Sequence, residues 1–499
     1  MTNQLGTEHE SGLFPGHPKG LPTLFFTEMW ERFSYYGMRA LLILFMTGTT
    51  IGENPGLGFD VVTAGAIYGL YTSLVYLLAL PGGWVADQIW GQRKAVFVGG
   101  CIIAAGHFSM AVPTHYTFFL GLILIVIGTG LLKPNVSSVV ADLYPEGGAR
   151  RDAGFSIFYM GINVGAMLGP FICSTLGEQY NWHWGFSAAG FGMVLGLIQF
   201  RLGYGPLGDA GVLRTDKSPE QVVRTANWFY GIFGAVVVAL VAFGLLVSNG
   251  TIPLALADIA QYLASAILLI IGVYFLYVVF WGRHTREEVR KVLVIFWLFV
   301  LAALFWSGFE QAGSSLNIFA RDYTDRTFGS LEYAAGLLQS VNAFFIIVMA
   351  PIFGWFWVWL ANRNANPSVP LKFALGLLGL SAGFFVIAWG AANATPESPV
   401  SASWLIVMYF LHTVGELALS PVGLSAVTKL APRNRISQMM GVWFVAAALG
   451  NLIAGLVAGR LEGLDPSPLF RLVAMIVGGG GLLALVVSPF VKRLMGNVK

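Results

Sequence analysis

Charged residues are scarce in this chain of 499 residues, because Asp, Glu, Lys and Arg together make up only 11% of it. A soluble globular domain carries about 25% of such residues, so the composition argues against a string of soluble domains. The net charge of +3 is small, and the basic residues are spread through the predicted loops rather than gathered in a patch. We therefore expect no nucleic-acid partner.

Cysteine is also scarce, and the two that occur, Cys101 and Cys173, fall inside apolar stretches. They match no metal-ligand spacing, so we expect packing residues rather than a disulfide or a metal site. The sequence contains no nucleophile elbow and no phosphate loop, which argues against an enzyme. The first 20 residues lack a basic-then-apolar pattern, so no cleaved signal peptide is expected.

Hydrophobic residues, in contrast, make up 56% of the chain, and the mean hydropathy is +0.71. Apolar runs of about 20 residues recur along the whole sequence, and each can cross a hydrocarbon core about 30 Å thick. Lipid cannot satisfy backbone polar groups, so these runs must be helices. We predict an all-α polytopic membrane protein with fourteen transmembrane helices, at 22–49, 60–88, 94–113, 117–142, 152–178, 183–204, 222–247, 258–281, 291–320, 329–361, 370–393, 401–430, 435–460 and 467–491.

The lysines and arginines of the loops predict the orientation. With the N-terminus in the cytoplasm, 21 of the 28 lie in cytoplasmic loops, and reversing the topology inverts this bias. We therefore predict that both termini are cytoplasmic. The four that lie outside are Arg321, Arg326, Arg460 and Arg471, and the three within helices are Arg32, Arg39 and Lys133.

A polar stretch at 203–225 separates the first six segments from the rest, and the two segments after it carry almost no ionisable residues in their cores. Two six-helix halves fit the pseudo-symmetric plan of secondary transporters, whose substrate site lies between the halves. The two extra helices are expected to form a peripheral, lipid-facing hairpin. We predict a cytoplasmic tail (1–21), an N-terminal six-helix bundle (22–204), a linker with the extra hairpin (205–290), and a C-terminal six-helix bundle with a short tail (291–499).

Six polar residues fall on one continuous face of the first predicted helix. They are Glu28, Glu31, Arg32, Tyr35, Tyr36 and Arg39. An ionisable side chain within a membrane helix is costly and marks a functional site by default. Lipid cannot solvate this face, so we expect it to look into a wet cavity or toward the opposing half. A structural ladder of salt bridges is the alternative interpretation.

Later segments supply polar partners for this face. Glu310 is followed by Ser314 and Asn317 at helical spacings of four and seven residues, and His412 precedes Glu416 by one turn. Other candidates in the middle of predicted helices are Lys133, Asn163 and Asn342. His412 is more simply a hydrogen-bonded helix residue than a switch, and the same holds for His107.

The buried acids outnumber the buried bases. Four acids, Glu28, Glu31, Glu310 and Glu416, face three bases, Arg32, Arg39 and Lys133. Burial disfavours the charged form, so one surplus carboxyl is expected to hold a proton, as a proton-coupled site requires. An acid and a base with amides between them also suit a zwitterion such as a peptide. All three bases lie in the N-terminal half, so we hypothesise that a peptide carboxylate docks there and the ammonium docks on Glu416.

Several motifs resemble those of a known family, the proton-dependent oligopeptide transporters of the major facilitator superfamily, along nearly the whole chain. The first-helix signature is matched by Glu28, Glu31, Arg32, Phe33, Tyr35, Tyr36 and Gly37. The superfamily loop between helices two and three resembles 83–94, with Gly83, Asp87 and Arg93. Signatures of helices four and five resemble 128–144 and 152–166, and the peptide-site helix resembles 415–425.

The resemblance implies a major facilitator fold, two six-helix bundles plus an inserted hairpin, and proton-coupled import of di- and tripeptides by alternating access. It implies these substrate-binding residues: Arg32, Tyr35, Tyr36, Arg39, Tyr76, Lys133, Asn163, Trp306, Asn342, Glu416 and Trp443. It implies proton coupling by Glu28, Glu31 and Glu310. The family's animal members carry a histidine where this chain has Gly69, so coupling through that histidine is excluded here.

The resemblance also implies a multi-pass protein of the bacterial plasma (inner) membrane, driven by the proton gradient without a cofactor. The expected partners are the peptide, protons and the lipid bilayer, and a monomer is expected. Two rival functions stay open. The same scaffold could carry nitrate or another small anion, which would leave Glu416 unexplained, or the chain could be a receptor that binds peptide without moving it.

Overall fold

The computed structural model describes residues 13–282, 284–432 and 435–496. Of the basic residues that the topology prediction places in the cytoplasm, Arg283, Arg433 and Lys499 lie outside the described residues, as do residues 1–12 of the predicted tail.

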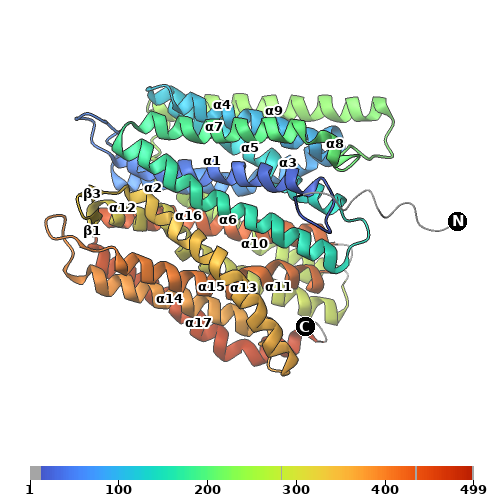
Figure 1. Cartoon of the computed structure of the whole chain (residues 1–499). Helices are drawn as coiled ribbons and strands as arrows, with labels where there is room; N and C mark the ends of the chain where they lie inside the picture. Colours follow the sequence, from blue (N-terminus) through green and yellow to red (C-terminus); the bar gives the residue numbers. More distant parts are fainter. Residues whose placement is uncertain (1–12, 283, 433–434, 497–499) are drawn as a thin grey trace. The chain divides into compact units, whose positions relative to one another are not determined.

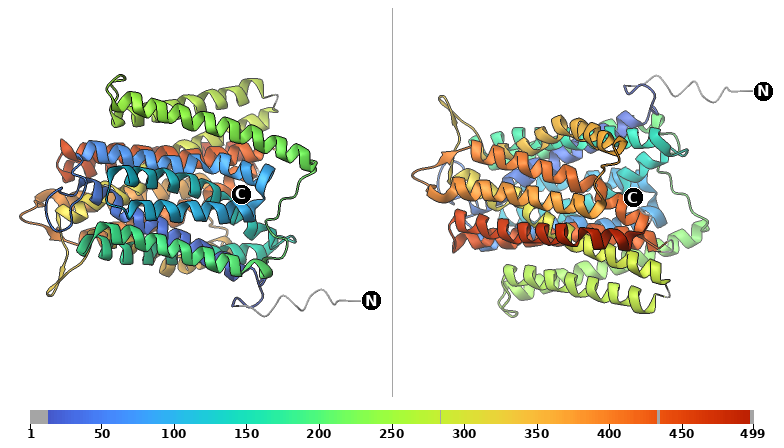
Figure 2. Two further views of the ribbon diagram at one scale, coloured as in Figure 1. Left: turned by 90° about the horizontal axis from the view of Figure 1, so that it is seen from above. Right: turned by 90° about the horizontal axis from the view of Figure 1, so that it is seen from below.

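Helices account for most of the described chain, and they can be followed along it in Figures 1 and 2. In chain order they are α1 (Leu21–Thr47), α2 (Val61–Leu77), α3 (Ala79–Val85), η1 (Ala86–Trp90), α4 (Gln92–Met110), α5 (His115–Asp142), α6 (Gly148–Gln179), α7 (Trp182–Leu202), α8 (Tyr204–Leu207), α9 (Pro219–Ser248), α10 (Leu256–Trp281), α11 (Arg286–Phe309), η2 (Glu310–Gly313), α12 (Ser315–Asp322), η3 (Ala335–Gln339), α13 (Ser340–Asn362), α14 (Val369–Gly390), η4 (Ala391–Asn393), α15 (Ser403–Leu430), α16 (Ile436–Ala458), η6 (Gly459–Glu462) and α17 (Pro466–Met495).

Four two-residue strands complete the secondary structure that the described residues form. β1 (Thr324–Asp325) pairs in parallel with β4 (Val400–Ser401), and β2 (Thr327–Phe328) pairs antiparallel with β3 (Leu331–Glu332). The β2–β3 hairpin precedes η3, so the predicted helix start at 329 is wrong and the helix begins at Ala335. The predicted start at 291 is also late, because Thr285 and Glu288 form a capping box that begins α11 at Arg286.

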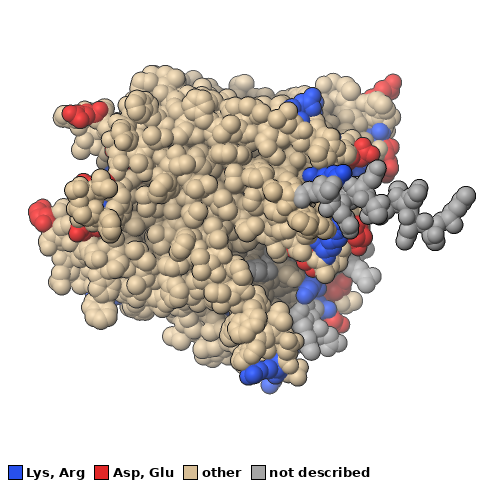
Figure 3. Space-filling model, in the orientation of Figure 1, with Lys and Arg blue, Asp and Glu red and all other residues tan. Residues whose placement is uncertain are grey.

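Twelve described segments are long and apolar enough to cross a membrane by length and composition. α1 and α4 are the two predicted spans outside this set. α1 is 27 residues long, and its composition differs because Glu28, Glu31, Arg32 and Arg39 interrupt its apolar sequence. On the face that Figure 3 shows, Lys, Arg, Asp and Glu lie at the ends of helices, and the surface along the helices is uncharged.

The packing of the chain divides it into two compact units. Unit 1 consists of residues 1–34, 78–165 and 190–259, and unit 2 consists of residues 35–77, 166–189 and 260–499. Both units are discontinuous, and α1, α6, α7 and α10 each contribute to both. The predicted division into two bundles and a hairpin runs along the sequence instead, and it stays a prediction.

In unit 1, α4 and α5 lie side by side and α3 packs on α5. A Cβ added at Gly99 would run into the backbone of Gly128, so glycine allows this close approach. The core is built from apolar side chains of α1, α4, α5 and α7, among them Leu24, Val96 and Val136. The helix α9 contributes almost nothing to this core, and its large apolar side chains are exposed, as expected for a lipid-facing helix.

In unit 2, α14 packs against α15 and α17, and α16 packs against α2 and α11. α2 and α16 cross closely: a Cβ added at Gly65 would meet the carbonyl of Gly455, and one added at Gly455 would meet the backbone of Gly65 and Gly69. Small residues allow this kind of approach in membrane helices.

Candidate functional site

The first polar cluster belongs to unit 1 and centres on Arg32 of α1. Arg32 Nε lies 3.2 Å from Glu28 Oε1 and also donates to Glu31 Oε2. All three side chains are buried. Lys133 of α5 acts electrostatically on Glu28, so two bases face two acids. The structure thus brings these four predicted residues together.

Each acid of this cluster keeps one oxygen, Glu28 Oε2 and Glu31 Oε1, without a hydrogen-bond partner among the described residues. Buried carboxylate oxygens usually have partners, so this cluster can accept further donors. Next to it, Ser34 Oγ lies 3.1 Å from His107 Nε2, which fits the interpretation of His107 as a hydrogen-bonded helix residue.

The predicted amide Asn163 lies on α6 in the same unit. Its Nδ2 donates to the carbonyl of Tyr159 at 2.9 Å, within its own helix. The predicted contact of Asn163 with substrate stays a prediction.

The second polar cluster belongs to unit 2 and centres on Arg39, seven residues further along α1. Arg39 Nη1 lies 2.6 Å from Glu310 Oε2, and both side chains are buried. The guanidinium also stands over the ring of Tyr36, 5.0 Å from its centroid. A buried ion pair of this geometry is costly to break on one side, because the remaining charge has no solvent.

Glu310 sits where the ninth predicted helix is interrupted. α11 ends at Phe309, Glu310–Gly313 form a tight 3₁₀ turn, and Ser314 has non-helical backbone angles before α12 begins. The expectation that Ser314 and Asn317 share one helical face with Glu310 is therefore wrong. Ser314 Oγ donates to the Ala454 carbonyl, and Asn317 Nδ2 donates to the Ala40 carbonyl.

A third group, also in unit 2, joins α13 and α15. Asn342 Nδ2 lies 3.3 Å from Glu416 Oε2 and 2.9 Å from Thr413 Oγ1. The charges of Glu310 and Arg39 both act on the buried Glu416. Glu416, Asn342, Glu310 and Arg39 therefore form one electrostatically connected set.

Of the predicted aromatic residues, Tyr35 and Tyr36 interact with Arg39 of this set. The rings of Tyr35 and Tyr36 meet edge to face at 5.2 Å, and Tyr76 acts electrostatically on Tyr35. Trp306 packs on Phe309, and Trp443 lies 6.1 Å from Phe373.

The neighbouring histidine of the predicted site is enclosed by rings. The ring centroid of His412 lies 6.5 Å from that of Phe309 and 4.9 Å from that of Phe384. A backbone hydrogen bond with Leu380 fits its interpretation as a hydrogen-bonded helix residue, although its Nε2 has no hydrogen-bond partner among the described residues.

Lys372, which is buried, and Glu178, which is half-buried, were not singled out from the sequence. Lys372 on α14 is only 9% exposed and stands over the ring of Trp357, so the expectation that every buried base lies in the N-terminal half is wrong. Glu178, at the end of α6, accepts from the backbone amides of Ala335 and Gly336. Glu178 is the last residue of the predicted span 152–178, and no sequence pattern marked it as a site residue.

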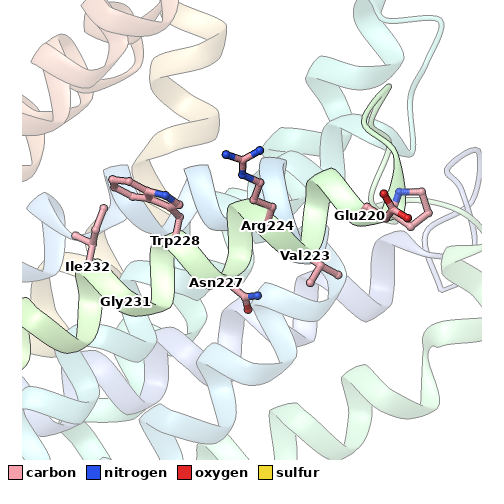
Figure 4. Close-up of a pocket in the computed structure, with 8 residues that line it drawn as sticks. Glu220, Val223, Arg224, Asn227, Trp228, Gly231 and Ile232 are labelled. Atoms are coloured by element: carbon pink, nitrogen blue, oxygen red, sulfur yellow. The ribbon is translucent and has the colours of Figure 1, made fainter.

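An open pocket of about 800 Å³ lies elsewhere, along α9 in unit 1 (Figure 4). Figure 4 shows its lining, which includes Glu220, Arg224 and Trp228. It contains none of the predicted site residues, and its lining residues come from a single helix.

Comparison with known proteins gives consistent matches. The model of the POT family matches residues 93–465. A peptide transporter of Yersinia enterocolitica subsp. palearctica is 42% identical over 97% of both chains. A di-/tripeptide transporter of Lactococcus lactis subsp. lactis is 35% identical over 97% of this chain and 98% of its own.

Solved structures agree with the sequence matches. A crystal structure of a POT peptide transporter in complex with sulfate is 40% identical, with a TM-score of 0.88 over 97% of both chains. A POT family transporter in complex with 5-aminolevulinic acid is 35% identical, with a TM-score of 0.87 over 97% of this chain and 98% of its own.

Proposed function

Because this chain belongs to the POT family, with its all-α major facilitator fold, we propose that it is a proton-coupled symporter that imports di- and tripeptides by alternating access. The observation that carries the proposal is the connected set in unit 2. There a buried carboxylate held by an amide, Glu416 with Asn342, is under the influence of the buried pair Arg39–Glu310.

This set suits a zwitterion. Glu416 can accept the ammonium of a peptide. Asn342 can hold the Glu416 carboxylate and can also bind a peptide backbone group. Relatives named as peptide and di-/tripeptide transporters support this substrate class. The solved complex with 5-aminolevulinic acid supports it further, because that molecule carries an amino group and a carboxylate at its two ends.

Proton coupling follows from the Arg39–Glu310 pair. A proton that enters from outside neutralises Glu310, and Arg39 then loses its partner and becomes available for another anion. The peptide carboxylate is that anion, and the bases Arg32 and Lys133 serve it in the same way when Glu28 or Glu31 is protonated. Loss of the proton to the cytoplasm restores the ion pairs, which favours release of the peptide.

The proposal also gives roles to the remaining site residues and states where and how the protein works. Tyr35, Tyr36, Tyr76, Trp306 and Trp443 provide apolar contacts that tolerate varied side chains. Asn163 binds the peptide backbone. The protein works as a monomer in the plasma (inner) membrane with both termini in the cytoplasm, catalyses no reaction, and uses the proton gradient instead of a cofactor.

Transport of a small anion is the less favoured alternative. Binding of such an anion would require only a basic pocket. Glu416 would then place a buried acid where an anion binds, and Asn342 would have no reason to hold it. A receptor without transport leaves the ion pair of Arg39 with Glu310 unexplained.

The test is uptake of labelled dialanine by purified protein in liposomes, with and without an inward proton gradient. Accumulation that requires the gradient, and that unlabelled di- and tripeptides compete, is the expected result. If folded protein takes up no dialanine in either condition, the substrate class is wrong.

A further inference from the structure

The end of α6 is bound to the beginning of the η3–α13 helix by one carboxylate, within unit 2. Glu178 Oε2 accepts from the amide of Ala335 at 2.7 Å, and Glu178 Oε1 accepts from the amide of Gly336 at 2.9 Å. The two donors are the first two amides of the helix. Both carboxylate oxygens of Glu178 thus accept hydrogen bonds from a helix that begins 157 residues further along the chain.

The helix needs this contact, because it does not cap itself. The first amides of a helix have no partner inside it, and a side chain before the helix usually accepts from them. Here the preceding residue is Ala334, whose side chain cannot accept a hydrogen bond. A carboxylate is well suited to the task, because the helix dipole places partial positive charge at this end.

Neighbouring contacts join α6 to η3–α13 and to β3, which precedes that helix. Ser340 Oγ donates to the carbonyl of Met167 at 2.7 Å, and Gln179 Nε2 donates to the carbonyl of Glu332 at 2.7 Å. Ser174 Oγ lies directly against Gly336, where a Cβ would clash with it. α6 and η3–α13 are therefore packed without space between them at this end.

Other helices of unit 2 are joined at the same predicted outer end. Asn317 Nδ2 donates to the Ala40 carbonyl and Arg321 Nη1 donates to Thr47 Oγ1, both at 2.7 Å, which ties α12 to α1. The glycine crossing of α2 and α16 adds a third junction. In each junction one partner comes from the first 189 residues and the other from residues 260–499, so unit 2 is closed at this end.

We propose that Glu178 is the latch of this closed end, a residue that sets how often the outward-facing state forms. This inference rests on the proposed alternating access, because opening toward the outside must separate α6 from η3–α13. When the two elements separate, the amides of Ala335 and Gly336 lose their acceptor, because the side chain of Ala334 cannot replace Glu178. A variant with a weaker cap shifts the equilibrium toward the open state and leaves the peptide-binding residues unaltered.

The experiment measures how fast a cysteine thiol that is buried at this junction reacts with a maleimide. Ser174 is fully buried at the junction, so Ser174→Cys, in a chain with Cys101→Ala and Cys173→Ala, reacts with a charged maleimide only after opening. In lipid nanodiscs, Glu178→Gln is expected to raise the labelling rate about fivefold, the ratio that loss of a typical helix cap produces. Glu332→Gln, which removes an exposed carboxylate of the same region paired with Arg326, is the matched control and should leave the rate unchanged.

A second variant tests the other side of the contact. Ala335→Pro removes the amide that donates to Glu178 Oε2, at a first helical position where proline fits. It should also raise the labelling rate, and its combination with Glu178→Gln should add little, because both variants break one contact. This variant keeps the test informative if Glu178→Gln does not fold.

Wild-type labelling rates in both single variants would overturn the latch, and so would an equal rise in Glu332→Gln. Dialanine counterflow by the unaltered protein tests the proposed function separately. If counterflow fails while Glu178→Gln still speeds labelling, the substrate assignment is wrong and the latch stands.

Discussion

Arg32 and Arg39 lie seven residues apart on one helix, yet their surroundings differ in a way that bears on transport. Arg32 is bound by two acids of its own helix, Glu28 and Glu31. Arg39 is bound by Glu310, which is 271 residues away in the sequence. A pair within one helix survives any movement of that helix as a body, whereas a pair between helices breaks when they separate.

This difference assigns different roles to the two clusters. The Arg32 cluster can change charge without a change of packing, because its acids move with it. The Arg39–Glu310 pair links protonation to the contact between α1 and the α11–α12 break. Its charges also act on Glu416. We therefore expect variants of the second cluster to have the larger effects.

The largest effect is expected from Glu416→Gln. The glutamine keeps the size of the side chain and removes the negative charge that a peptide ammonium requires. Loss of one partner of a buried charge pair costs about 2–5 kcal/mol, so dipeptide affinity should fall by about 30-fold or more. Binding measured by calorimetry, with Glu332→Gln as the control, checks this; unchanged affinity would remove Glu416 from the site.

The next effect concerns stability and compares the two arginines directly. A double-mutant cycle of Arg39→Gln and Glu310→Gln should give a coupling free energy of about 3 kcal/mol, because each single variant leaves a buried charge unpaired. The equivalent cycle of Arg32→Gln and Glu28→Gln should give about 1 kcal/mol, because Glu31 still binds Arg32. Unfolding free energies in mixed micelles provide both numbers, and equal couplings would abolish the distinction between the clusters.

A smaller effect is expected for transport by Glu28→Gln. Glu31 continues to neutralise Arg32, so proton-driven dialanine accumulation should fall by less than about tenfold. The double variant Glu28→Gln/Glu31→Gln should fall much further. If the single variant already abolishes accumulation, Glu28 is the primary proton acceptor and the two acids do not share the role.

The smallest effect belongs to an exposed acid, which provides the contrast with the buried ones. Asp60 Oδ1 accepts from the amide of Thr63 and Oδ2 accepts from its hydroxyl, both at 2.7 Å. The backbone hydrogen bond from Thr63 is the main cause that lowers the pKa of Asp60 below its usual value. The stabilisation is therefore present at neutral pH and is lost as the pH falls below about 4.

Asp60→Ala should accordingly lower the unfolding free energy at pH 7 by at most about 1 kcal/mol, because solvent screens the group. The difference from the unaltered protein should shrink below pH 4. A constant difference between pH 3 and pH 7 would show that the side chain acts by shape and not by charge.

The helices of this protein could be predicted because each span is encoded locally. The apolar runs predict thirteen of fourteen helix starts within five residues. The exception, at 329, failed because β3 (Leu331–Glu332) lies within the predicted run and the helix begins only at Ala335. The pairing of Arg32 with Glu28 also follows from spacing on one helix.

The rest of the site depends on contacts that the sequence does not display. The pairing of Arg39 with Glu310 spans 271 residues, and no local pattern marks it. The 3₁₀ turn at Glu310 broke the helical spacing that placed Ser314 and Asn317 beside it. Glu178 was missed because its partners are backbone amides, which every residue except proline offers.

The most direct test of the central claim compares counterflow with accumulation in liposomes that contain Glu310→Gln. Counterflow requires only binding and alternating access, whereas accumulation also requires a proton to move with the peptide. If Glu310 couples the two, dialanine counterflow persists in this variant and gradient-driven accumulation is lost. Full accumulation by Glu310→Gln would contradict the account, because the Arg39–Glu310 pair would then not couple protons to peptide movement.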